Sequence, residues 1–416
     1  MAWKLAQSVH VERMWAAPGN PGMAAEKLAA SGRSVELLDI PATNLPALAD
    51  AAEALSVDLT VVGPDDPVGA GIVDVFAARG LRAWGPGRAA ARVESSKAFA
   101  QAFMERHGLP VPRARAFTSP DGACRFVREL GGRCAVKADG LALGKGVVVC
   151  RDEHSALDAI EAMLVTGAYG PAGSRVVVQE LLEGMEVSLH AICDGTDAVL
   201  FPLAQDHKAA MDGDQGPNTG GMGVITPAPF AAPEGMSALD KDIVKPFVQA
   251  CQAEHLEFRG VFYPGVMLTP HGPKVFEINA RFGDPEAQAY LPKLDVDLVD
   301  LIEASLTGTL SQVSMAWNDS HVVCVVLASA GYPHGYDTGH AIYGLEEVAA
   351  LPRTKVFHAA TRVDGATPRT AGGRVLGVTA WDQDLVAARD AAYRAVELVS
   401  FTNKYYRTDI GAKAFQ

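Results

Sequence analysis

The segment most informative about chemistry is residues 275–286, where apolar positions alternate with acidic, amide and guanidinium side chains. If the segment begins as a β-strand, period-two alternation places Glu277, Asn279 and Arg281 on one face and apolar side chains on the other. A carboxylate and an amide oxygen two residues apart suit Mg²⁺, which prefers oxygen ligands and retains substrate phosphates. The planar fork of Arg281 suits a carboxylate or a phosphate. A solvent-facing polar strand is the alternative, and spacing alone does not decide between them.

A second segment, residues 135–147, places two lysines around a glycine-rich turn. Lys137 projects from an apolar strand, and Lys145 follows the turn. Backbone N–H groups and ammonium charges arranged in this way can enclose a polyphosphate. The segment is not a Walker A loop, because it is one residue short of G-x-x-x-x-G-K and Gly146 stands where the metal-binding Ser or Thr belongs. A glycine-rich hairpin with exposed lysines is the alternative.

A third and weaker segment, residues 176–188, is an apolar strand that runs into a short connector. Backbone groups of such a connector can read an adenine edge, and Glu186 could accept hydrogen bonds from ribose hydroxyls. A plain interdomain hinge explains the same pattern.

A fourth segment joins Asp206, His207 and Lys208 to a long loop, residues 212–223, that is rich in glycine. Glycines with Asn and Thr can form an anion-binding nest, and loops of this length in compact domains are usually functional or disordered. Disorder is the alternative for the loop, and a structural role is the alternative for His207. The charged neighbours of His207 favour a site.

The bulk properties indicate a folded, multidomain protein that binds phosphate only locally. At roughly 150 residues per domain, 416 residues correspond to about three units, and 49% hydrophobic and 20% charged residues are typical of globular chains. The net charge of −13 opposes binding to nucleic acid and to anionic membranes. A phosphate ligand must therefore be held by a compact cluster of cations and backbone N–H groups.

Cysteines and apolar runs predict a cytoplasmic location. The six cysteines lack the spacing of a zinc site and are expected to be reduced thiols. The first residues lack the apolar stretch of a signal peptide, and no run approaches the length that spans a bilayer.

The elements that must position these side chains alternate along the chain. Short apolar strands and Ala-rich helices before residue 93 predict a parallel α/β sheet, and the end of the chain predicts an α+β unit. The predicted fold class is thus α/β and α+β, in several domains. Within it we expect a helix at 95–107, a helix near 123–130, strands at 134–138, 147–150 and 175–179, a helix at 155–164, strands at 322–327 and 374–379, and a helix at 385–399.

Together the segments resemble the glycinamide ribonucleotide synthetases, also called phosphoribosylamine-glycine ligases, of the ATP-grasp superfamily. The resemblance covers nearly the whole chain, and the strings G-P-N-T-G-G-M-G at 216–223 and R-F-G-D-P-E at 281–286 are its most specific parts. It implies an ATP-grasp fold with a truncated Rossmann-like domain at 1–92, a central domain at 93–111 and 181–316, a lid domain at 112–180 and a C-terminal α+β domain at 317–416.

The resemblance also implies roles for individual residues. The expected reaction is the ligation of glycine to 5-phosphoribosylamine through glycyl phosphate, with ATP and Mg²⁺, or Mn²⁺ as an alternative. The expected catalytic residues are Arg281, Asp206 and Lys208. The expected ATP-binding residues are Lys97, Lys137, Gly144, Lys145, Glu180, Leu181, Leu182 and Glu186. The expected substrate-binding residues are His207, Asn218, Thr219, Gly220 and Asp284, and the expected metal ligands are Glu277 and Asn279. The expected partners are these small molecules alone, with the chain as a monomer.

The beginning of the chain departs from the family pattern. Members normally start with a strand and a G-x-G-G-R-E-H turn, and this sequence opens on the helix that follows. Loss of a central strand is expected to expose residues 13–17 and 59–62 and to weaken amine-substrate binding. A start assigned too far downstream is our preferred explanation, and a genuine truncation is the other. Residues 63–67 read G-P-D-D-P where the family usually has G-P-E-A-P.

Two rival functions remain. One is a different carboxylate-amine ligase or a carboxylase of the same superfamily. The other is a degenerate ATP-grasp protein that binds nucleotide with little ligase activity.

Overall fold

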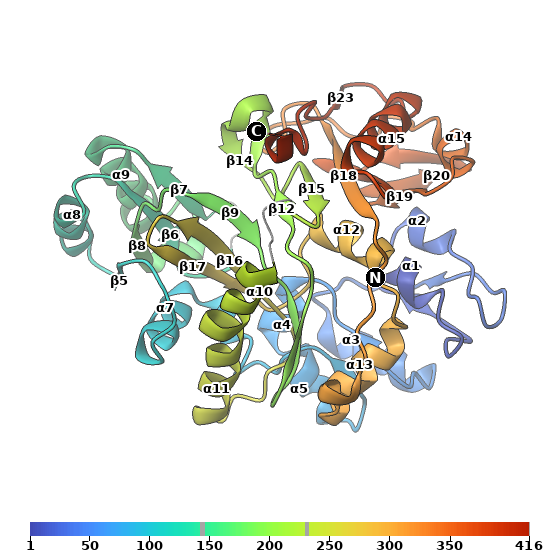
Figure 1. Cartoon of the computed structure of the whole chain (residues 1–416), viewed down its shortest axis with the longest axis horizontal. Helices are drawn as coiled ribbons and strands as arrows, with labels where there is room; N and C mark the ends of the chain where they lie inside the picture. The colour runs from blue at the N-terminus through green and yellow to red at the C-terminus, as the bar shows by residue number, and fades with distance from the viewer. Residues whose placement is uncertain (142–145, 229–232, 416) are drawn as a thin grey trace.

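The computed structural model describes residues 1–141, 146–228 and 233–415 (Figure 1). Three larger antiparallel sheets organise the molecule. The chain colours in Figure 1 show the lid at one end and the C-terminal strands at the other, with the N-terminal α1 and α2 beneath the C-terminal strands and the later N-terminal helices below the central part.

The N-terminal region contains short parallel strands covered by helices. β1 pairs with β2, β3 pairs with β4, and both pairs are parallel as predicted. The two pairs form separate two-stranded sheets, and β1 and β3 are each half-buried. The elements are α1 (Ala2–Leu5), β1 (Trp15–Ala16), α2 (Pro21–Ala24), β2 (Glu36–Leu37), α3 (Leu45–Ala54), β3 (Thr60–Val61), α4 (Asp65–Ala70), α5 (Ile72–Ala77) and β4 (Ala83–Trp84).

Two helices connect this region to the rest of the chain. α6 (Arg92–Ser95) is short and ends where Ser96 adopts an extended conformation. α7 (Lys97–Arg106) then begins, because the Ser96 side chain accepts a hydrogen bond from the N–H of Phe99 and caps the helix. The helix thus begins two residues after the predicted start at residue 95.

The lid is a four-stranded antiparallel sheet in the order β5-β8-β6-β7, packed against two helices. Its predicted elements are present within a few residues of their expected bounds. Apolar side chains such as Val136, Val178, Phe126 and Ile160 fill a separate core. The elements are β5 (Ala114–Phe117), α8 (Pro120–Glu129), β6 (Cys134–Ala138), β7 (Val147–Cys150), α9 (Glu153–Ile160) and β8 (Val176–Glu180).

The central sheet carries the acid and amide of the first predicted segment. Its long strand β16 (Arg259–Thr269) pairs with β17 (Gly272–Asn279), with β10 (Ala191–Asp194) and with β9 (Met185–Ser188), all antiparallel, and β11 (Ala198–Leu200) pairs with β10. α7, α11 (Lys245–Ala253) and this sheet share one apolar core.

The third sheet combines segments that lie far apart in the sequence. β12 (Gln205–Asp206) and β15 (Gly223–Thr226) extend a sheet whose other strands are β18 (His321–Ser329), β22 (Arg374–Asp382), β19 (Thr354–His358) and β23 (Lys404–Tyr405). The glycine-rich loop is therefore built onto C-terminal strands, although the sequence analysis places it in the central domain. The predicted domain limits stay a prediction.

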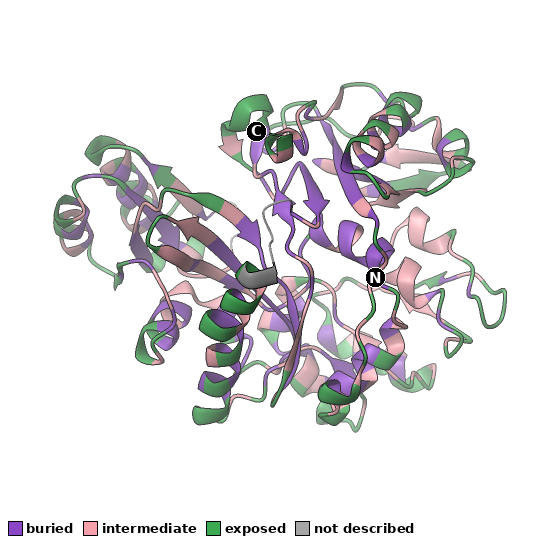
Figure 2. Ribbon diagram, in the orientation of Figure 1, coloured by how far each residue is buried: buried purple, intermediate pink, exposed green. Residues whose placement is uncertain are grey.

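Three further helices and the pattern of burial complete the fold. α12 (Glu286–Lys293) and α13 (Leu298–Thr307) pack against the sheets, and α15 (Leu385–Leu398) covers β18 and β22. Figure 2 shows buried strands at the centre and exposed outer faces of helices. Six cysteines in the described residues are free. No helix in the described part of the chain is long and apolar enough to cross a membrane.

Candidate active site

One cavity of about 790 Å³ lies where the lid, the central sheet, the N-terminal region and the C-terminal strands meet. Its lining includes most of the side chains predicted from the sequence. They are Lys97, Lys137, Glu180, Leu181, Leu182, Glu186, Lys208, Asn218, Thr219, Gly220, Glu277, Asn279, Arg281 and Asp284.

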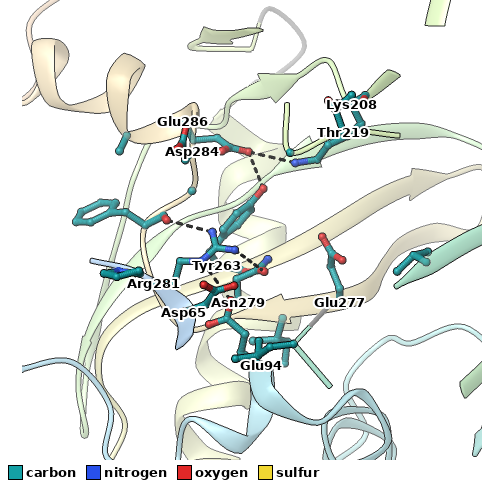
Figure 3. Close-up of a pocket in the computed structure, with 18 of the residues that line it drawn as sticks. Asp65, Glu94, Lys208, Thr219, Tyr263, Glu277, Asn279, Arg281, Asp284 and Glu286 are labelled. Atoms are coloured by element: carbon teal, nitrogen blue, oxygen red, sulfur yellow. Dashed lines mark hydrogen bonds and ion pairs between the residues drawn. The ribbon is translucent and has the colours of Figure 1, made fainter. Parts of the chain in front are cut away.

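The end of β17 presents the acid, the amide and the guanidinium to this cavity, as the strand periodicity predicts. Glu277 and Asn279 lie on β17, and Arg281 follows directly after its end. The Nη2 atom of Arg281 lies 3.3 Å from Oδ1 of Asn279 and donates to it. Figure 3 shows Arg281 beside Asn279, with Glu277 farther along the strand. The alternative of an ordinary solvent-facing strand is excluded by this placement.

Lys137 faces the same strand from the lid. It is 4% exposed, and its Nζ donates a 2.7 Å hydrogen bond to the carbonyl of Phe276. Burial lowers the pKa of Lys137 to about 8, although the charge of Glu277 acts in the opposite direction. Lys97 donates a 3.0 Å hydrogen bond to the carbonyl of Gly140, so it also approaches the lid turn. Two ammonium groups therefore converge on the cavity from different elements.

The connector between β8 and β9 forms another wall. Glu180, Leu181 and Leu182 line the cavity, and Oε1 of Glu180 accepts a hydrogen bond from the N–H of Arg113. Burial raises the pKa of Glu186 to about 7, which the charge of Lys208 opposes. The wall offers backbone groups and one carboxylate to a ligand.

A buried polar network holds Lys208. Its Nζ lies 2.5 Å from Oδ2 of Asp206 and 3.8 Å from Oε1 of Glu286. Oε1 of Glu286 also accepts hydrogen bonds from Tyr263 at 2.6 Å and Ser188 at 2.8 Å. Burial acts to raise the pKa of Glu286, but Lys208 and the other partners outweigh it and lower the pKa to about 2. Glu286 is therefore charged and anchors Lys208 at the edge of the cavity.

The glycine-rich loop is fixed by residues of the C-terminal strands. Arg374 donates hydrogen bonds to the carbonyls of Gly220 at 2.9 Å and Asp284 at 2.7 Å, and its Nη2 lies 3.2 Å from Oδ2 of Asp284. The Tyr332 hydroxyl accepts a hydrogen bond from the N–H of Gly220. Gly221 has φ of +116°, and a Cβ there would lie 2.5 Å from Pro285, so this close approach requires glycine.

His207 follows directly after β12 and does not line the cavity. Its Nδ1 contacts the carbonyl of Gly223 at 3.0 Å, and its Nε2 accepts a hydrogen bond from the N–H of Gly411. Burial lowers its pKa to about 4. His207 thus connects the end of β12 to the C-terminal segment, whereas Asp206 and Lys208 form an ion pair with each other. Period-two alternation alone could have separated His207 from its neighbours.

Two predicted ATP-binding residues cannot be placed. Gly144 and Lys145 lie outside the described residues. The sequence analysis also missed residues that the structure brings to the site, namely Asp65, Glu94, Tyr263, Glu286 and Arg374. Glu286 is the last residue of the R-F-G-D-P-E string at 281–286, so it could have been found, whereas Arg374 lies outside both strings given above. Asp65 stands in the G-P-D-D-P string at 63–67, which the sequence marked only as a departure from the family pattern, and no local pattern marks Glu94 or Tyr263.

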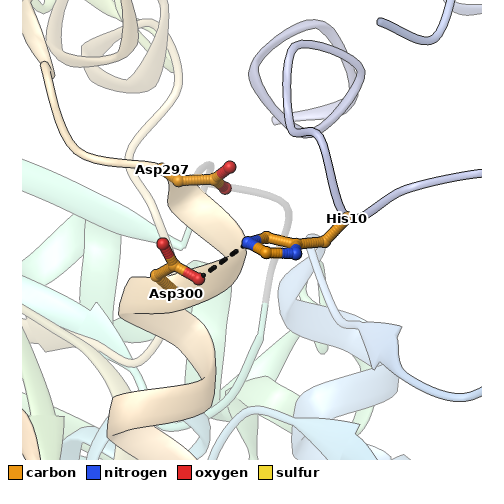
Figure 4. A group of neighbouring side chains, drawn as sticks. All are labelled: His10, Asp297 and Asp300. Atoms are coloured by element: carbon orange, nitrogen blue, oxygen red, sulfur yellow. Dashed lines mark ion pairs between the residues drawn. The ribbon is translucent and has the colours of Figure 1, made fainter. Parts of the chain in front are cut away.

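A second group of side chains lies on the surface, away from the cavity. His10 Nε2 is 3.2 Å from Oδ1 of Asp300, and Asp297 lies beside them (Figure 4). Asp297 accepts a 2.8 Å hydrogen bond from the N–H of Val299 and caps α13. The partial positive charge of a helix N-terminus favours carboxylates and opposes a cation. We interpret the group as a surface contact in which His10 pairs with Asp300 and so links the N-terminal loop to α13.

The residues at the end of β17 fit a divalent cation. Glu277 and Asn279 supply a carboxylate and an amide oxygen on one face, which are hard oxygen ligands. Glu277 has no ion pair or hydrogen bond to another side chain among the described residues, so its oxygens are available. Lys97 and Lys137 line the same cavity and could bind the phosphates of a nucleotide whose cation is held by Glu277 and Asn279.

An antiparallel lid sheet and a central antiparallel sheet that enclose lysines and oxygen ligands define an ATP-grasp protein. The chain has this fold in common with the biotin carboxylase of Campylobacter jejuni, with a TM-score of 0.72 at 15% identity over 99% of this chain and 95% of that one. The chain belongs to the phosphoribosylglycinamide synthetase family. The N domain of the family matches residues 1–94, the ATP-grasp (A) domain residues 95–287 and the C domain residues 322–413.

Individual relatives agree with this assignment. The phosphoribosylamine--glycine ligase of Allochromatium vinosum is 44% identical over 415 residues, which cover 100% of this chain and 95% of that protein. That of Rhodopirellula baltica is 42% identical over 422 residues, which cover 100% and 94%. The crystal structure of the Thermotoga maritima ligase gives a TM-score of 0.82 at 26% identity, covering 98% of this chain and 96% of that one. The predicted family and fold are confirmed.

Proposed function

We propose that this chain uses ATP to join glycine to 5-phosphoribosylamine through glycyl phosphate, forming glycinamide ribonucleotide, ADP and phosphate. Membership of the ligase family supports this reaction. The observation that carries it is that oxygen ligands, lysines and Arg281 line one cavity. The predictions of a monomer, of small-molecule partners alone and of a cytoplasmic location stay predictions.

ATP lies between the lid and the central sheet in this proposal. Glu180, Leu181 and Leu182 contact the adenine, and Glu186 accepts hydrogen bonds from the ribose. Lys97 and Lys137 contact the phosphates. Their convergence on the cavity from two elements supports this assignment. The same role is proposed for Gly144 and Lys145 on the basis of the lid sequence.

Glu277 and Asn279 would hold Mg²⁺, or Mn²⁺, which when bound neutralises charge on the phosphoryl group that is transferred. The protein supplies positioning and fixed charge for this step, and it needs no covalent nucleophile. An oxygen of the glycine carboxylate attacks the γ-phosphorus, and ADP leaves with the electron pair of the broken P–O bond.

Arg281 and Lys208 hold the reacting carboxylate and then the acyl phosphate. Both are half-buried, and both are fixed by carboxylates, so their charges are already oriented before substrate binds. Asp206 orients Lys208. Asn218, Thr219, Gly220 and Asp284 complete the substrate pocket, and His207 supports it from behind. The amine then attacks the carbonyl carbon, and phosphate leaves.

The test is ADP release by the purified chain with glycine, with and without phosphoribosylamine generated in place from ribose 5-phosphate and ammonia. Replacement of glycine by other acids separates this ligase from relatives with other substrates. ATP binding without glycine-dependent ADP release would instead support a nucleotide-binding protein that has lost activity.

Glu277→Ala tests the metal assignment. Loss of this ligand should abolish glycine-dependent ADP release while the melting temperature changes little. Glu257→Ala is the matched control, because Glu257 is exposed and lies outside the cavity lining. Equal turnover of both variants would remove Glu277 from the site.

A further inference from the structure

The carboxylate of Asp65 faces the cavity without a role in the reaction described so far. Asp65 begins α4 in the N-terminal region, and α4 packs against α6, which carries Glu94. Figure 3 shows Asp65 below the guanidinium of Arg281 and beside Glu94. The charges of Glu94 and Asp65 outweigh the burial of Arg281 and raise the pKa of its guanidinium. Asp65 is therefore close to the group proposed to hold the acyl phosphate.

The other carboxylates of the cavity have partners or roles. Glu94 binds Arg281, Asp284 binds Arg374, and Glu286 lies in the network around Lys208. Glu277 and Glu186 face the lid lysines and are proposed for the metal and the ribose. Asp65 lines the cavity from α4 of the N-terminal region and has none of these roles.

The hydrogen bonds of Asp65 leave one oxygen for a ligand. In the described residues, its side chain makes one hydrogen bond, in which Oδ1 accepts from the N–H of Asp66 at 3.0 Å. It makes no ion pair within that same part of the chain. Oδ2 is thus the atom that a substrate could contact.

We propose that Asp65 binds the attacking amine of the second substrate and accepts its proton, an inference that rests on the ligase function proposed above. The nitrogen lone pair forms a bond to the carbonyl carbon of glycyl phosphate, and the C–O bond to phosphate breaks with its electrons on phosphate. One proton of the nitrogen passes to Oδ2 of Asp65 and then to water. Asp65 is therefore a catalytic residue for the second half-reaction.

Position in the first turn of a helix is the competing explanation for Asp65, because acidic residues are favourable there in any short helix. Asp66 provides the matched control. It occupies the same turn of α4, but it does not line the cavity. A helix-end role would affect both aspartates in a similar way, whereas a catalytic role concerns Asp65 alone.

The experiment separates the two half-reactions in the full chain. Hydroxylamine replaces the amine substrate and traps glycyl phosphate as a hydroxamate. It is a small, strong nucleophile that attacks acyl phosphates in water and loses its proton to the solvent, so its reaction does not depend on Asp65. Asp65→Asn should lower ligation to phosphoribosylamine by about 10²- to 10⁴-fold, the range of general-base effects, and leave hydroxamate formation within about threefold. Asp65→Glu, which restores the carboxylate, should recover most of the ligation, and Asp66→Asn should leave both rates near those of the unsubstituted chain.

Each result has a defined meaning. Unchanged ligation in Asp65→Asn, or an equal loss of both rates, would overturn the proposal for Asp65. A similar loss in Asp66→Asn would point to the helix end. If the unsubstituted chain forms no glycine-dependent hydroxamate, the ligase function fails instead, so the two failures are distinguishable.

Discussion

The Oε1 atom of Glu94 lies 3.2 Å from Nε of Arg281, and Oε2 of the same carboxylate accepts a 2.8 Å hydrogen bond from the N–H of Ala280. Glu94 is 7% exposed. Burial raises its pKa, and the charge of Arg281 opposes that shift. One carboxylate from α6 thus fixes both the backbone after β17 and the direction of the guanidinium. Glu94 acts as a positioning residue for Arg281.

Glu94→Gln should lower kcat/KM for glycine by about 10- to 100-fold, because a small displacement of a positioned group has effects of this size. Glutamine keeps an oxygen for Ala280 but loses the charge that orients Arg281. A double-mutant cycle with Arg281→Gln is the measurement. In the Arg281→Gln background the second substitution should add almost nothing, and fully additive losses would contradict the positioning role.

ATP binding should weaken in alkaline solution because of Lys137. Burial lowers its pKa to about 8, so its ammonium charge is present below pH 8 and is lost above it. The Kd of a non-hydrolysable ATP analogue should therefore rise by up to about tenfold per pH unit above 8. In Lys137→Arg the charge persists and the rise should disappear. Lys274→Arg, on β17 of the central sheet and outside the cavity lining, should titrate like the unsubstituted chain.

His190 should make the protein less stable in acid. Its Nε2 accepts a hydrogen bond from the N–H of Gly283, its ring stacks on Tyr263 at 3.9 Å, and burial lowers its pKa to about 3. Below its unfolded pKa of about 6.5 the unfolded chain binds a proton that the folded chain does not, so stability falls as pH falls. Between pH 7 and pH 5 this amounts to about 2 kcal/mol.

The measurement for His190 is urea unfolding at pH 7 and pH 5. In His190→Asn the difference between the two free energies of unfolding should shrink by about 2 kcal/mol, whatever the variant loses at pH 7. His10→Asn is the control, because His10 is exposed. An unchanged difference in His190→Asn would show that folding does not lower the pKa of this histidine.

Arg374 should matter for activity although it belongs to the C-terminal strands. Arg374→Ala removes the hydrogen bonds that join Gly220 to Asp284, so the substrate loop should lose order and kcat/KM should fall by about 10- to 100-fold. Arg374→Lys should rescue little, because one ammonium cannot reproduce the planar fork. Arg369→Ala is the control, since Arg369 pairs with Asp364 outside the cavity lining. Equal effects of both alanine variants on turnover would contradict this role.

Gly221→Ala should also impair the enzyme. A Cβ there would lie 2.5 Å from Pro285 and 2.8 Å from the carboxylate of Asp206, at a φ that side chains rarely adopt. Turnover should fall more than tenfold, with a lower melting temperature. Gly235→Ala, where no atom lies within 4 Å of the added Cβ, should leave turnover unchanged, and a normal rate in Gly221→Ala would show that the loop can shift.

The sequence by itself determined the features that depend on local periodicity. Alternation along β17 predicted that Glu277 and Asn279 share one face, and that face lines the cavity. Lys137 was predicted to project from a strand, and it lies on β6 of the lid. The lid helices and strands were predicted within a few residues, because strand propensity and helix capping are short-range effects. Composition alone marked Asp206, Lys208 and the glycine-rich loop, and the family resemblance then assigned roles to them.

Only the tertiary structure decided which groups complete the site. Glu94 reaches Arg281 across 187 positions of the chain, and Arg374 reaches Gly220 across 154, so no local pattern could pair them. These contacts depend on which apolar faces pack together. The packing of these faces depends on the whole chain, because the burial of one sheet against its neighbours fixes the positions of the strand ends that carry the polar side chains.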